Sequence, residues 1–254
     1  MKSGNTLGVV IPTYNRFNET VKAVESVLNQ TLKVSQVIVV DDGSDLDIYN
    51  KLEKAIQNES VELLRINHSG HPGIAREAGR VRLNTDWIAF LDSDDRWNAD
   101  KLERIFYYQN VYNASAICSK AYGLDFDNTS PTITRYLHRN ELFQANKIVN
   151  SSVVLRAELL DEIGGIATSY SVRGCEDYAT WLRIADKSKW LFVNEPLLVY
   201  NNDSLDSIRN DEEFPQSFSN IYALLDYALY SKTKEKKRKI VLRILLKYFW
   251  RFVK

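Results

Sequence analysis

The stretch Trp87–Asp95 reads WIAFLDSDD, which is five apolar residues followed by three acids within four positions. A short apolar run that ends in turn-forming polar residues is typical of a buried β-strand. We therefore predict a strand over Trp87–Leu91 and a helix that begins near Ala99. The acids follow directly where this predicted strand ends.

Upstream of this stretch, the same apolar-then-polar pattern occurs three more times, each time followed by an amphipathic stretch. The predicted strands are Leu7–Ile11, Val34–Val40 and Val61–Ile66, and the predicted helices cover about 18–29 and 46–57, with a third entered through Pro72-Gly73. This alternation predicts an α/β fold with a parallel sheet. Ligands of open parallel sheets bind beyond the carboxyl ends of the strands, so we expect the chemistry at these ends.

The second half of the chain has a more mixed pattern. Strand-like pieces occur at Ala116–Tyr122 and Val153–Leu155, and helical patterns at about Glu176–Lys187 and Phe218–Tyr230. No internal repeat or low-complexity linker separates the halves. We predict a mostly parallel central sheet flanked by helices, with a C-terminal helical extension.

The composition excludes several classes of protein. With 254 residues, 44% hydrophobic and 26% charged, the chain can bury a core and is not a disordered protein. Two cysteines, Cys118 and Cys175, do not indicate a disulfide framework or a zinc site and favour a reducing, cytoplasmic setting. The sequence predicts neither a signal peptide nor a membrane-spanning segment.

The net charge of zero conceals two regions of opposite charge. Residues 232–254 contain ten Lys or Arg and one acid, which leaves 23 basic and 32 acidic residues in 1–231. The acidic body disfavours nucleic acid as a partner, whereas a basic and apolar tail favours an anionic surface. A helix over 240–253 would measure about 21 Å, too short for a bilayer core of ~30 Å. We expect it to lie in an anionic membrane surface, or else to dock on the body or on a second copy.

The acids Asp92, Asp94 and Asp95 would repel one another unless a cation or strong hydrogen-bond donors neutralise them. Carboxylates without nearby His or Cys suit Mg²⁺ or Mn²⁺, and Mg²⁺ commonly completes its shell with substrate phosphates. We therefore predict a divalent metal site beside a nucleotide diphosphate. The alternative is that these acids only end a strand and cap the next helix.

Glycine-rich phosphate loops are missing from the sequence. Neither the dinucleotide fingerprint nor the Walker pattern follows any predicted strand. This disfavours hydride transfer and P-loop phosphoryl transfer.

Four segments together resemble family 2 of the glycosyltransferases. They are VVIPTYNR at 9–16, VVDDGS at 39–44, AFLDSDD at 89–95, and EDY at 176–178 with WLR at 181–183. They follow the order of the family over about residues 7–200. The resemblance implies a Rossmann-like A-type glycosyltransferase fold and inverting transfer of a sugar from a nucleotide donor.

The resemblance also implies an organisation of the chain. The catalytic domain would cover 1–210, with a nucleotide-binding half at about 1–115 and an acceptor-side half at 116–210. The C-terminal helical segment with the basic amphipathic tail would cover 211–254.

On the nucleotide side, the resemblance implies roles for two short segments. Pro12, Thr13 and Tyr14 match the loop that contacts the nucleoside, with Tyr14 placed to stack on the base. Asp42, with Asp41 beside it, matches the acids that bind the pyrimidine and the ribose. A carboxylate there can accept a hydrogen bond from the N–H of uracil, which favours uridine.

The metal motif of the family matches Asp92-Ser93-Asp94. Asp94 would contact a Mn²⁺ or Mg²⁺ ion directly, Asp92 would contact the ribose or a metal-bound water, and Ser93 would lie on the nucleotide side.

The catalytic motif of the family matches the start of the helix predicted from Glu176. Asp177 would be the general base that removes the proton of the acceptor hydroxyl. Glu176 and Trp181 would lie beside the acceptor or the donor sugar. Without the resemblance, two acids in a first helical turn simply complement the helix dipole.

The sequence departs from the family pattern at two places. Glu77 follows Arg76 where the family commonly has asparagine, so Arg76 either meets the diphosphate or forms a structural ion pair. The family often has a histidine after the last strand, but this chain reads NNDS at 201–204, so no third protein ligand for the metal is identified.

From these features we expect a metal-dependent, inverting hexosyl- or N-acetylhexosaminyltransferase. It would move a sugar from a UDP-sugar to a glycan acceptor, lipid-linked, in bacterial cell-surface polysaccharide biosynthesis, on the inner face of the cell membrane. One alternative is a catalytically idle nucleotide-sugar-binding subunit that docks a partner through its C-terminal helix. A nucleotidyltransferase is disfavoured, because that chemistry needs a basic phosphate-binding loop after the first predicted strand, and Arg16 is the only basic residue in that loop. Homo-oligomerisation stays open.

Overall fold

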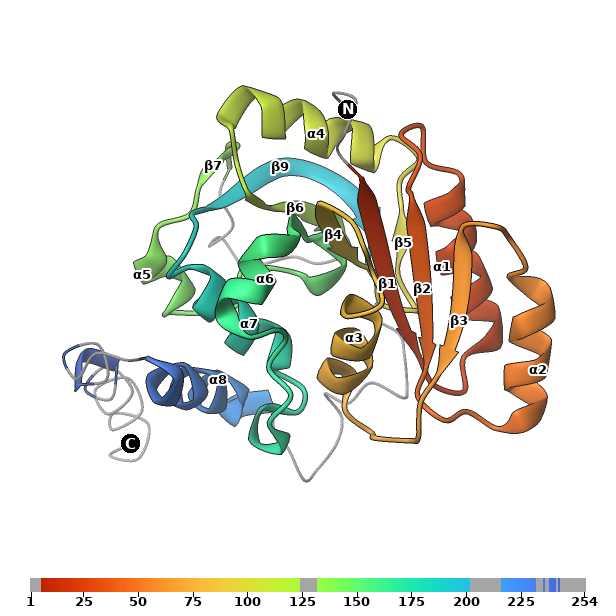
Figure 1. The fold of residues 1–254 in the computed structure, drawn as a ribbon. Coiled ribbons are helices and arrows are strands. Elements are labelled where there is room, and N and C mark those ends of the chain that lie inside the picture. Colours follow the sequence, from red (N-terminus) through yellow and green to blue (C-terminus); the bar gives the residue numbers. More distant parts are fainter. Residues whose placement is uncertain are drawn as a thin grey trace.

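The computed structural model describes residues 6–123, 132–201, 216–231, 235, 238–240 and 242. In this part of the chain, a nine-stranded sheet has the order β3-β2-β1-β4-β8-β6-β9-β5, with β7 beside β9 (Figure 1). The strands are β1 (Leu7–Thr13), β2 (Gln36–Asp41), β3 (Val61–Arg65), β4 (Trp87–Phe90), β5 (Arg96–Trp97), β6 (Ala116–Tyr122), β7 (Arg135–Tyr136), β8 (Val154–Arg156) and β9 (Trp190–Val199). The helices are α1 (Phe17–Leu28), α2 (Leu46–Ala55), α3 (Pro72–Arg80), α4 (Lys101–Tyr112), α5 (Arg139–Leu142), α6 (Ala157–Ile163), α7 (Glu176–Ile184) and α8 (Gln216–Tyr230).

The first half of the sheet is parallel and the second half is mixed. β1 pairs in parallel with β2 and β4, and β2 pairs in parallel with β3. β8 is antiparallel to β4 and β6, β9 is antiparallel to β5 and β7, and β6 and β9 are parallel. The predicted α/β fold is confirmed, and the parallel arrangement extends over the first four predicted strands. The second half departs from it because β8 runs antiparallel to both of its neighbours, β4 and β6.

Each face of the sheet is covered by its own set of helices (Figure 1). Successive strand residues point to opposite faces, so Val9 and Ile11 pack with α1, α2 and α4, whereas Val10 packs with α3, α6 and α7. The layers therefore follow directly from the apolar runs in the sequence.

Helix α3 lies unusually close to the sheet. A Cβ atom on Gly79 would lie 2.5 Å from Cγ1 of Val10 and 2.9 Å from Cγ2 of Val40, which are distances that real Cβ atoms do not reach. Gly79 therefore lets α3 contact β1 and β2 directly. This contact fixes where Arg76, one turn earlier, meets the carboxyl end of the sheet.

Helix α8 docks on α7 and extends the hydrophobic core that contains Val10, on the face of the sheet covered by α3, α6 and α7. Tyr227 is fully buried, and Arg183 of α7 forms an ion pair of 2.6 Å with Asp226 of α8. Ile240, from the first part of the predicted tail, is buried in the same core, whereas Leu242 is exposed. Most of the predicted tail, 232–254, lies outside the described residues. Among the helices of the described ranges, none has both the length and the apolar character needed to cross a membrane.

Candidate active site

The carboxyl ends of β1, β2 and β4 bring the predicted site residues to one edge of the sheet. Tyr14 follows β1, Asp42 follows β2, and Asp92 follows β4. Because β1 lies between β2 and β4, the two groups of acids flank the loop that begins at Tyr14. The predicted location of the chemistry therefore matches the topology.

Asp41 and Asp42, the first acid cluster, are held by neighbouring groups of the protein. Asp41 is fully buried, lies 3.2 Å from Nη1 of Arg65, and accepts from the backbone N–H of Ser44. Asp42 accepts from the N–H of Ser69 at 2.8 Å and from the N–H of Gly70 at 3.0 Å. The carboxylate of Asp41 has no exposed surface, so we assign it to the scaffold instead of the predicted direct contact with a nucleotide.

Three further acids, Asp92, Asp94 and Asp95, form the second acid cluster, which is less completely neutralised. Asp94 accepts from Nη1 of Arg16 at 2.7 Å, yet burial and the nearby charge of Asp92 raise its pKa. Burial and the charge of Asp92 also raise the pKa of Asp95 to about 8. Oδ2 of Asp95 is buried and has no hydrogen-bond partner among the described residues. Asp95 is therefore mostly protonated at neutral pH, and the charge of Asp94 is incompletely compensated.

This donor set fits a divalent cation that shares its shell with phosphate. Hard carboxylate oxygens suit Mg²⁺ or Mn²⁺, and one or two carboxylates suffice when substrate phosphates supply further ligands. Asp92 and Asp94 would hold such an ion, and the raised pKa of Asp94 shows that its charge lacks full compensation. Within the described ranges, no group of three His, Cys, Asp or Glu side chains is arranged around a common metal position.

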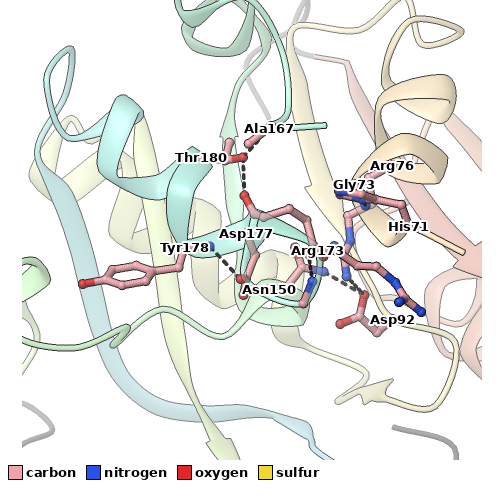
Figure 2. A network of polar contacts seen from close by, with 12 residues as sticks. His71, Gly73, Arg76, Asp92, Asn150, Ala167, Arg173, Asp177, Tyr178 and Thr180 are labelled. Carbon is pink, nitrogen blue, oxygen red and sulfur yellow. Dashed lines mark hydrogen bonds and ion pairs between the residues drawn. The ribbon is translucent and has the colours of Figure 1, made fainter. Parts of the chain in front are cut away.

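Arg76 of α3 joins the second acid cluster to the start of α7 (Figure 2). Its Nη2 donates to Asp92 at 2.7 Å and its Nη1 to Glu176 at 2.6 Å, with only 8% of the side chain exposed. Burial by itself would lower the pKa of Arg76, but the carboxylates of Asp92 and Glu176 outweigh it and raise the pKa. Of the two interpretations left open by the sequence, the structure therefore favours the structural ion pair over direct contact with a diphosphate.

Asp177 lies in the first turn of α7, next to this ion-pair network. Its Oδ1 accepts from the N–H of Tyr178 at 2.6 Å (Figure 2). Its Oδ2 lies 3.3 Å from Nδ2 of Asn146. Burial and the adjacent charge of Glu176 raise the pKa of Asp177 to about 6. A carboxylate with this pKa is ionised at neutral pH and is basic enough to accept a proton in a transition state.

Two residues predicted on the sugar side are buried. Glu176 is buried, pairs with Arg76 and accepts from the N–H of Gly174, so it holds the network together. Trp181 is 1% exposed and packs between Phe90 and Trp190 in the core. Trp181 therefore lies on the side of α7 that faces the core, and its predicted place beside the sugar stays a prediction.

The remaining predicted nucleotide-side residues differ in exposure. Tyr14 is 45% exposed, whereas Thr13 is buried and its hydroxyl lies 2.6 Å from that of Thr20. Pro12 is partly buried within β1, and Ser93 is buried beside the acids. Of this set, Tyr14 is the one that presents a large surface to a ligand.

Sequence reasoning missed two residues of the site. Arg16 reaches Asp94 from the loop after β1. Asn150 donates to Asp92 at 2.9 Å, and its own Oδ1 is buried without a partner in the described part of the chain. A polar triplet at 150–152 inside the apolar run 148–155 was the available signal, because such a triplet is unfavourable in a core without a polar partner.

The sequence matches the family model named glycosyl transferase family 2 over residues 8–156. It is similar to TuaG of Bacillus subtilis (strain 168), a glycosyltransferase assigned to teichuronic acid biosynthesis, with 27% identity over 209 residues, 79% of this chain and 81% of that protein. It is also similar to the UDP-Glc:alpha-D-GlcNAc-diphosphoundecaprenol beta-1,3-glucosyltransferase WfaP of Escherichia coli, with 28% identity over 191 residues, 71% of this chain and 70% of WfaP. An uncharacterised glycosyltransferase of Rickettsia bellii (strain RML369-C) shares 40% identity over 97 residues, which span 38% of this chain and 14% of that protein.

Two solved structures resemble the fold. Residues 1–349 of TarS from S. aureus, in complex with UDP-GlcNAc, give a TM-score of 0.76 at 16% identity, covering 96% of this chain and 72% of that one. The mannosyltransferase PcManGT from Pyrobaculum calidifontis, in complex with GDP-Man and Mn²⁺, gives a TM-score of 0.65 at 15% identity, covering 96% and 81%. At these identities the likeness shows the A-type glycosyltransferase fold. With a family model that matches more than half of its residues, the chain belongs to glycosyl transferase family 2.

Proposed function

We propose that this protein is an inverting glycosyltransferase that moves a sugar from a UDP-sugar to a glycan acceptor in bacterial cell-surface polysaccharide biosynthesis. The observation that supports the proposal is the position of Asp177, which directly follows Glu176, and Arg76 joins Glu176 to Asp92 of the second acid cluster. Direct displacement at a sugar carbon needs a base held close to the bound donor. One ion-pair network would hold both groups in place.

The proposed step uses one carboxylate as a base. Asp177 takes the proton from the acceptor hydroxyl while that oxygen bonds to the anomeric carbon. The bond between this carbon and the diphosphate oxygen breaks, and UDP leaves with the electron pair. Because acceptor and leaving group lie on opposite sides of the carbon, the configuration inverts.

Asp92 and Asp94 are the residues that would hold a divalent metal. When bound, such an ion supplies positive charge that stabilises the departing diphosphate. Arg76 keeps Asp92 in position, and Arg16 does the same for Asp94. The donor-binding function is assigned to the half at about 1–115 and the acceptor side to 116–210.

Two relatives support the choice of substrates. TarS binds UDP and UDP-GlcNAc in solved structures, which supports a uridine donor with Asp42 near the base. The name of WfaP states a UDP-Glc donor and a diphosphoundecaprenol-linked acceptor, which supports a lipid-linked acceptor. The basic tail at 232–254 would hold the enzyme at the anionic inner face of the membrane.

The proposal is tested by measuring the thermal stability of the protein with UDP, GDP, CDP and dTDP, each with and without Mn²⁺ or Mg²⁺. We expect the largest metal-dependent stabilisation with UDP, since bound ligand stabilises the folded state. Stabilisation by none of the four, with either metal, would overturn the assignment of the donor site.

A base substitution then separates catalysis from binding. Asp177→Asn should abolish transfer and change the affinity for UDP less than threefold, while the exposed Asp47→Asn serves as the matched control. Transfer retained by Asp177→Asn would remove the assigned base. Inactive wild-type protein that still binds UDP would favour the idle binding subunit.

The membrane assignment has its own test. Deletion of 243–254 keeps Ile240, which is buried in the core, and removes four basic residues. We expect the shortened protein to lose binding to anionic vesicles at unchanged melting temperature. A loss of stability or of an oligomer would favour docking of the tail on protein.

A further inference from the structure

Helix α8 presents large apolar side chains on its outer face. Among residues 220–231, whose side chains the structure describes, the exposed positions are Tyr222, Leu225 and Leu229. Their exposed fractions are 39%, 40% and 79%. With spacings of three and four residues, they form one stripe along the helix, called here the α8 stripe. A helix on a protein surface normally turns polar side chains to water, so an apolar stripe of this kind marks an interaction surface.

The opposite face of α8 is already occupied by the protein itself. Ala223, Leu224 and Tyr227 are buried in the core that α8 shares with α7. Asp226 is the one acid in the sequence of α8, and it forms an ion pair of 2.6 Å with Arg183 of α7. The α8 stripe is therefore not the face that holds the helix on the protein, and the only carboxylate of the helix is neutralised elsewhere.

The chain continues from α8 into its most basic segment. Residues 232–254 contain ten Lys or Arg and one acid, Glu235. Glu235 pairs with Lys239 at 2.5 Å, and both side chains are exposed. Leu242 is 56% exposed. In Figure 1, the described residues of this segment lie beyond the C-terminal end of α8, so positive charge follows directly on the apolar stripe.

An anionic lipid surface accounts for both features together. Apolar side chains of such a helix enter the boundary between headgroups and acyl chains, while nearby Lys and Arg side chains attract anionic headgroups. A second copy of the chain fits less well, because a symmetric dimer brings the same surface of both subunits together. Two basic segments, each with nine net positive charges, would then be close to each other and repel.

Helix α8 also lies directly against the segment that carries the proposed base. The short helix η2 (Tyr170–Val172) and α7 both contact α8, and Asp177 lies in the first turn of α7. Val172 and Cys175, on the approach to α7, are buried in the same core as Leu224. A surface that binds α8 therefore holds the turn of Asp177 at a fixed position relative to that surface.

We propose that the α8 stripe enters the surface of an anionic membrane and sets the orientation of the enzyme on it. This proposal rests on the proposed function and adds an apolar contact to the electrostatic attraction of the basic tail. The membrane that carries the lipid-linked acceptor would then keep a constant position relative to Asp177.

The test removes the apolar stripe and keeps every charge. The double variant Leu225→Gln/Leu229→Gln is compared with the wild type and with Val111→Gln, a matched change in α4, where Val111 is 60% exposed. The probes are vesicles of phosphatidylcholine with and without phosphatidylglycerol, in co-sedimentation of the full chain. Melting temperature, UDP binding with Mn²⁺ and molecular mass in solution are measured on the same proteins.

We expect the double variant to bind the phosphatidylglycerol vesicles about tenfold more weakly than the wild type, in line with the loss of two leucine side chains from the lipid. Val111→Gln should bind them as the wild type does. Both variants should keep the melting temperature of the wild type, because glutamine replaces exposed side chains and is a good helix former.

Three results would overturn the proposal. The first is wild-type protein that binds neither kind of vesicle, or that binds no better than the double variant. The second is a wild-type dimer that becomes monomeric in the double variant, which would assign the α8 stripe to a second copy. The third is a lower melting temperature of the double variant, which would assign the stripe to another part of this chain, such as 243–254.

UDP binding separates this proposal from the proposed function. Wild-type protein that binds vesicles but no nucleoside diphosphate contradicts the donor site and leaves the α8 stripe in place. Wild-type protein that binds UDP, together with a double variant that binds vesicles equally well, contradicts only the α8 stripe.

Discussion

The first and second acid clusters lie at the ends of β2 and β4, on either side of β1. Their charges are neutralised to different degrees. Asp41 pairs with Arg65, and both Asp41 and Asp42 accept hydrogen bonds from backbone N–H groups. In the second cluster, Arg16 and Arg76 each contact one acid, yet the pKa of Asp94 stays raised and that of Asp95 reaches about 8.

The difference lies in which carboxylates are neutralised by hydrogen-bond donors of the protein itself. Charges that hold loops in place are neutralised inside the protein, so the first cluster contributes to the scaffold. Charges that remain poorly compensated are unfavourable for folding alone and are typical of sites that bind a cation or react. The second cluster is therefore the better candidate for metal and diphosphate.

The comparison is sharpened most by removing one charge from the second cluster. Asp94→Asn should lower the rate of transfer roughly 100-fold or more, because a metal ligand and its charge are lost. The melting temperature should hardly change, since a crowded charge is also removed. Initial rates over a Mn²⁺ titration provide the measurement; a normal rate at every Mn²⁺ concentration would exclude Asp94 as a ligand.

The matched change in the first cluster should have the opposite outcome. Asp41→Asn should lower the free energy of unfolding by about 2 kcal/mol, because it leaves Arg65 without its buried partner. This figure is below the usual range for buried pairs since the side chain of Arg65 is 31% exposed. Urea unfolding measures the effect, and the folded variant should bind UDP normally. A stable variant that cannot bind UDP would give Asp41 the ligand role instead.

A pH profile tests whether the network prepares Asp177 as the base. Its pKa is raised to about 6 by burial and by the charge of Glu176, and the base works only when unprotonated. Transfer should therefore be nearly constant above about pH 7 and fall roughly tenfold between pH 7 and pH 5. The decisive quantity is kcat at saturating substrates, with melting temperatures at each pH as the control. A kcat that stays constant down to pH 5 would contradict the assignment.

The smallest effect is expected from removing one of several hydrogen-bond donors to Asp42 in the first cluster. Ser69→Ala removes the hydroxyl that donates to Oδ1 of Asp42 at 2.9 Å, while the backbone N–H of residue 69 continues to donate to the same oxygen. The free energy of unfolding should fall by about 1 kcal/mol, the usual net value of one hydrogen bond. UDP affinity should change less than threefold. A large loss of affinity would show that Asp42 lacks the redundancy assigned to it.

Several features could be predicted from the sequence because their causes are local. The apolar runs of β1 to β4 and the acids that follow them lie within a few residues of each other, so one short window holds both the strand and its functional end. The positions of Tyr14, Asp42 and Asp92 at one edge then followed from the rule for parallel strands. The resemblance to the family depended on the same short windows.

Other features depended on contacts between distant parts of the chain. Arg76 and Glu176 are 100 positions apart, and Arg16 and Asp94 are 78 apart. No window of sequence contains either pair, and Arg76 could equally have faced a phosphate. The short strands β5 and β7, the helices α5 and α6, and the mixed half of the sheet were likewise decided by packing.

The sequence by itself determined the α/β class, the family, and which acids stand at the strand ends, because local periodicity and short motifs encode them. The tertiary structure alone decided which acids are neutralised, which way Trp181 points, and which face of α8 is exposed. These outcomes depend on which distant donors and rings reach the same place, and that is a property of the packed chain rather than of any segment of it.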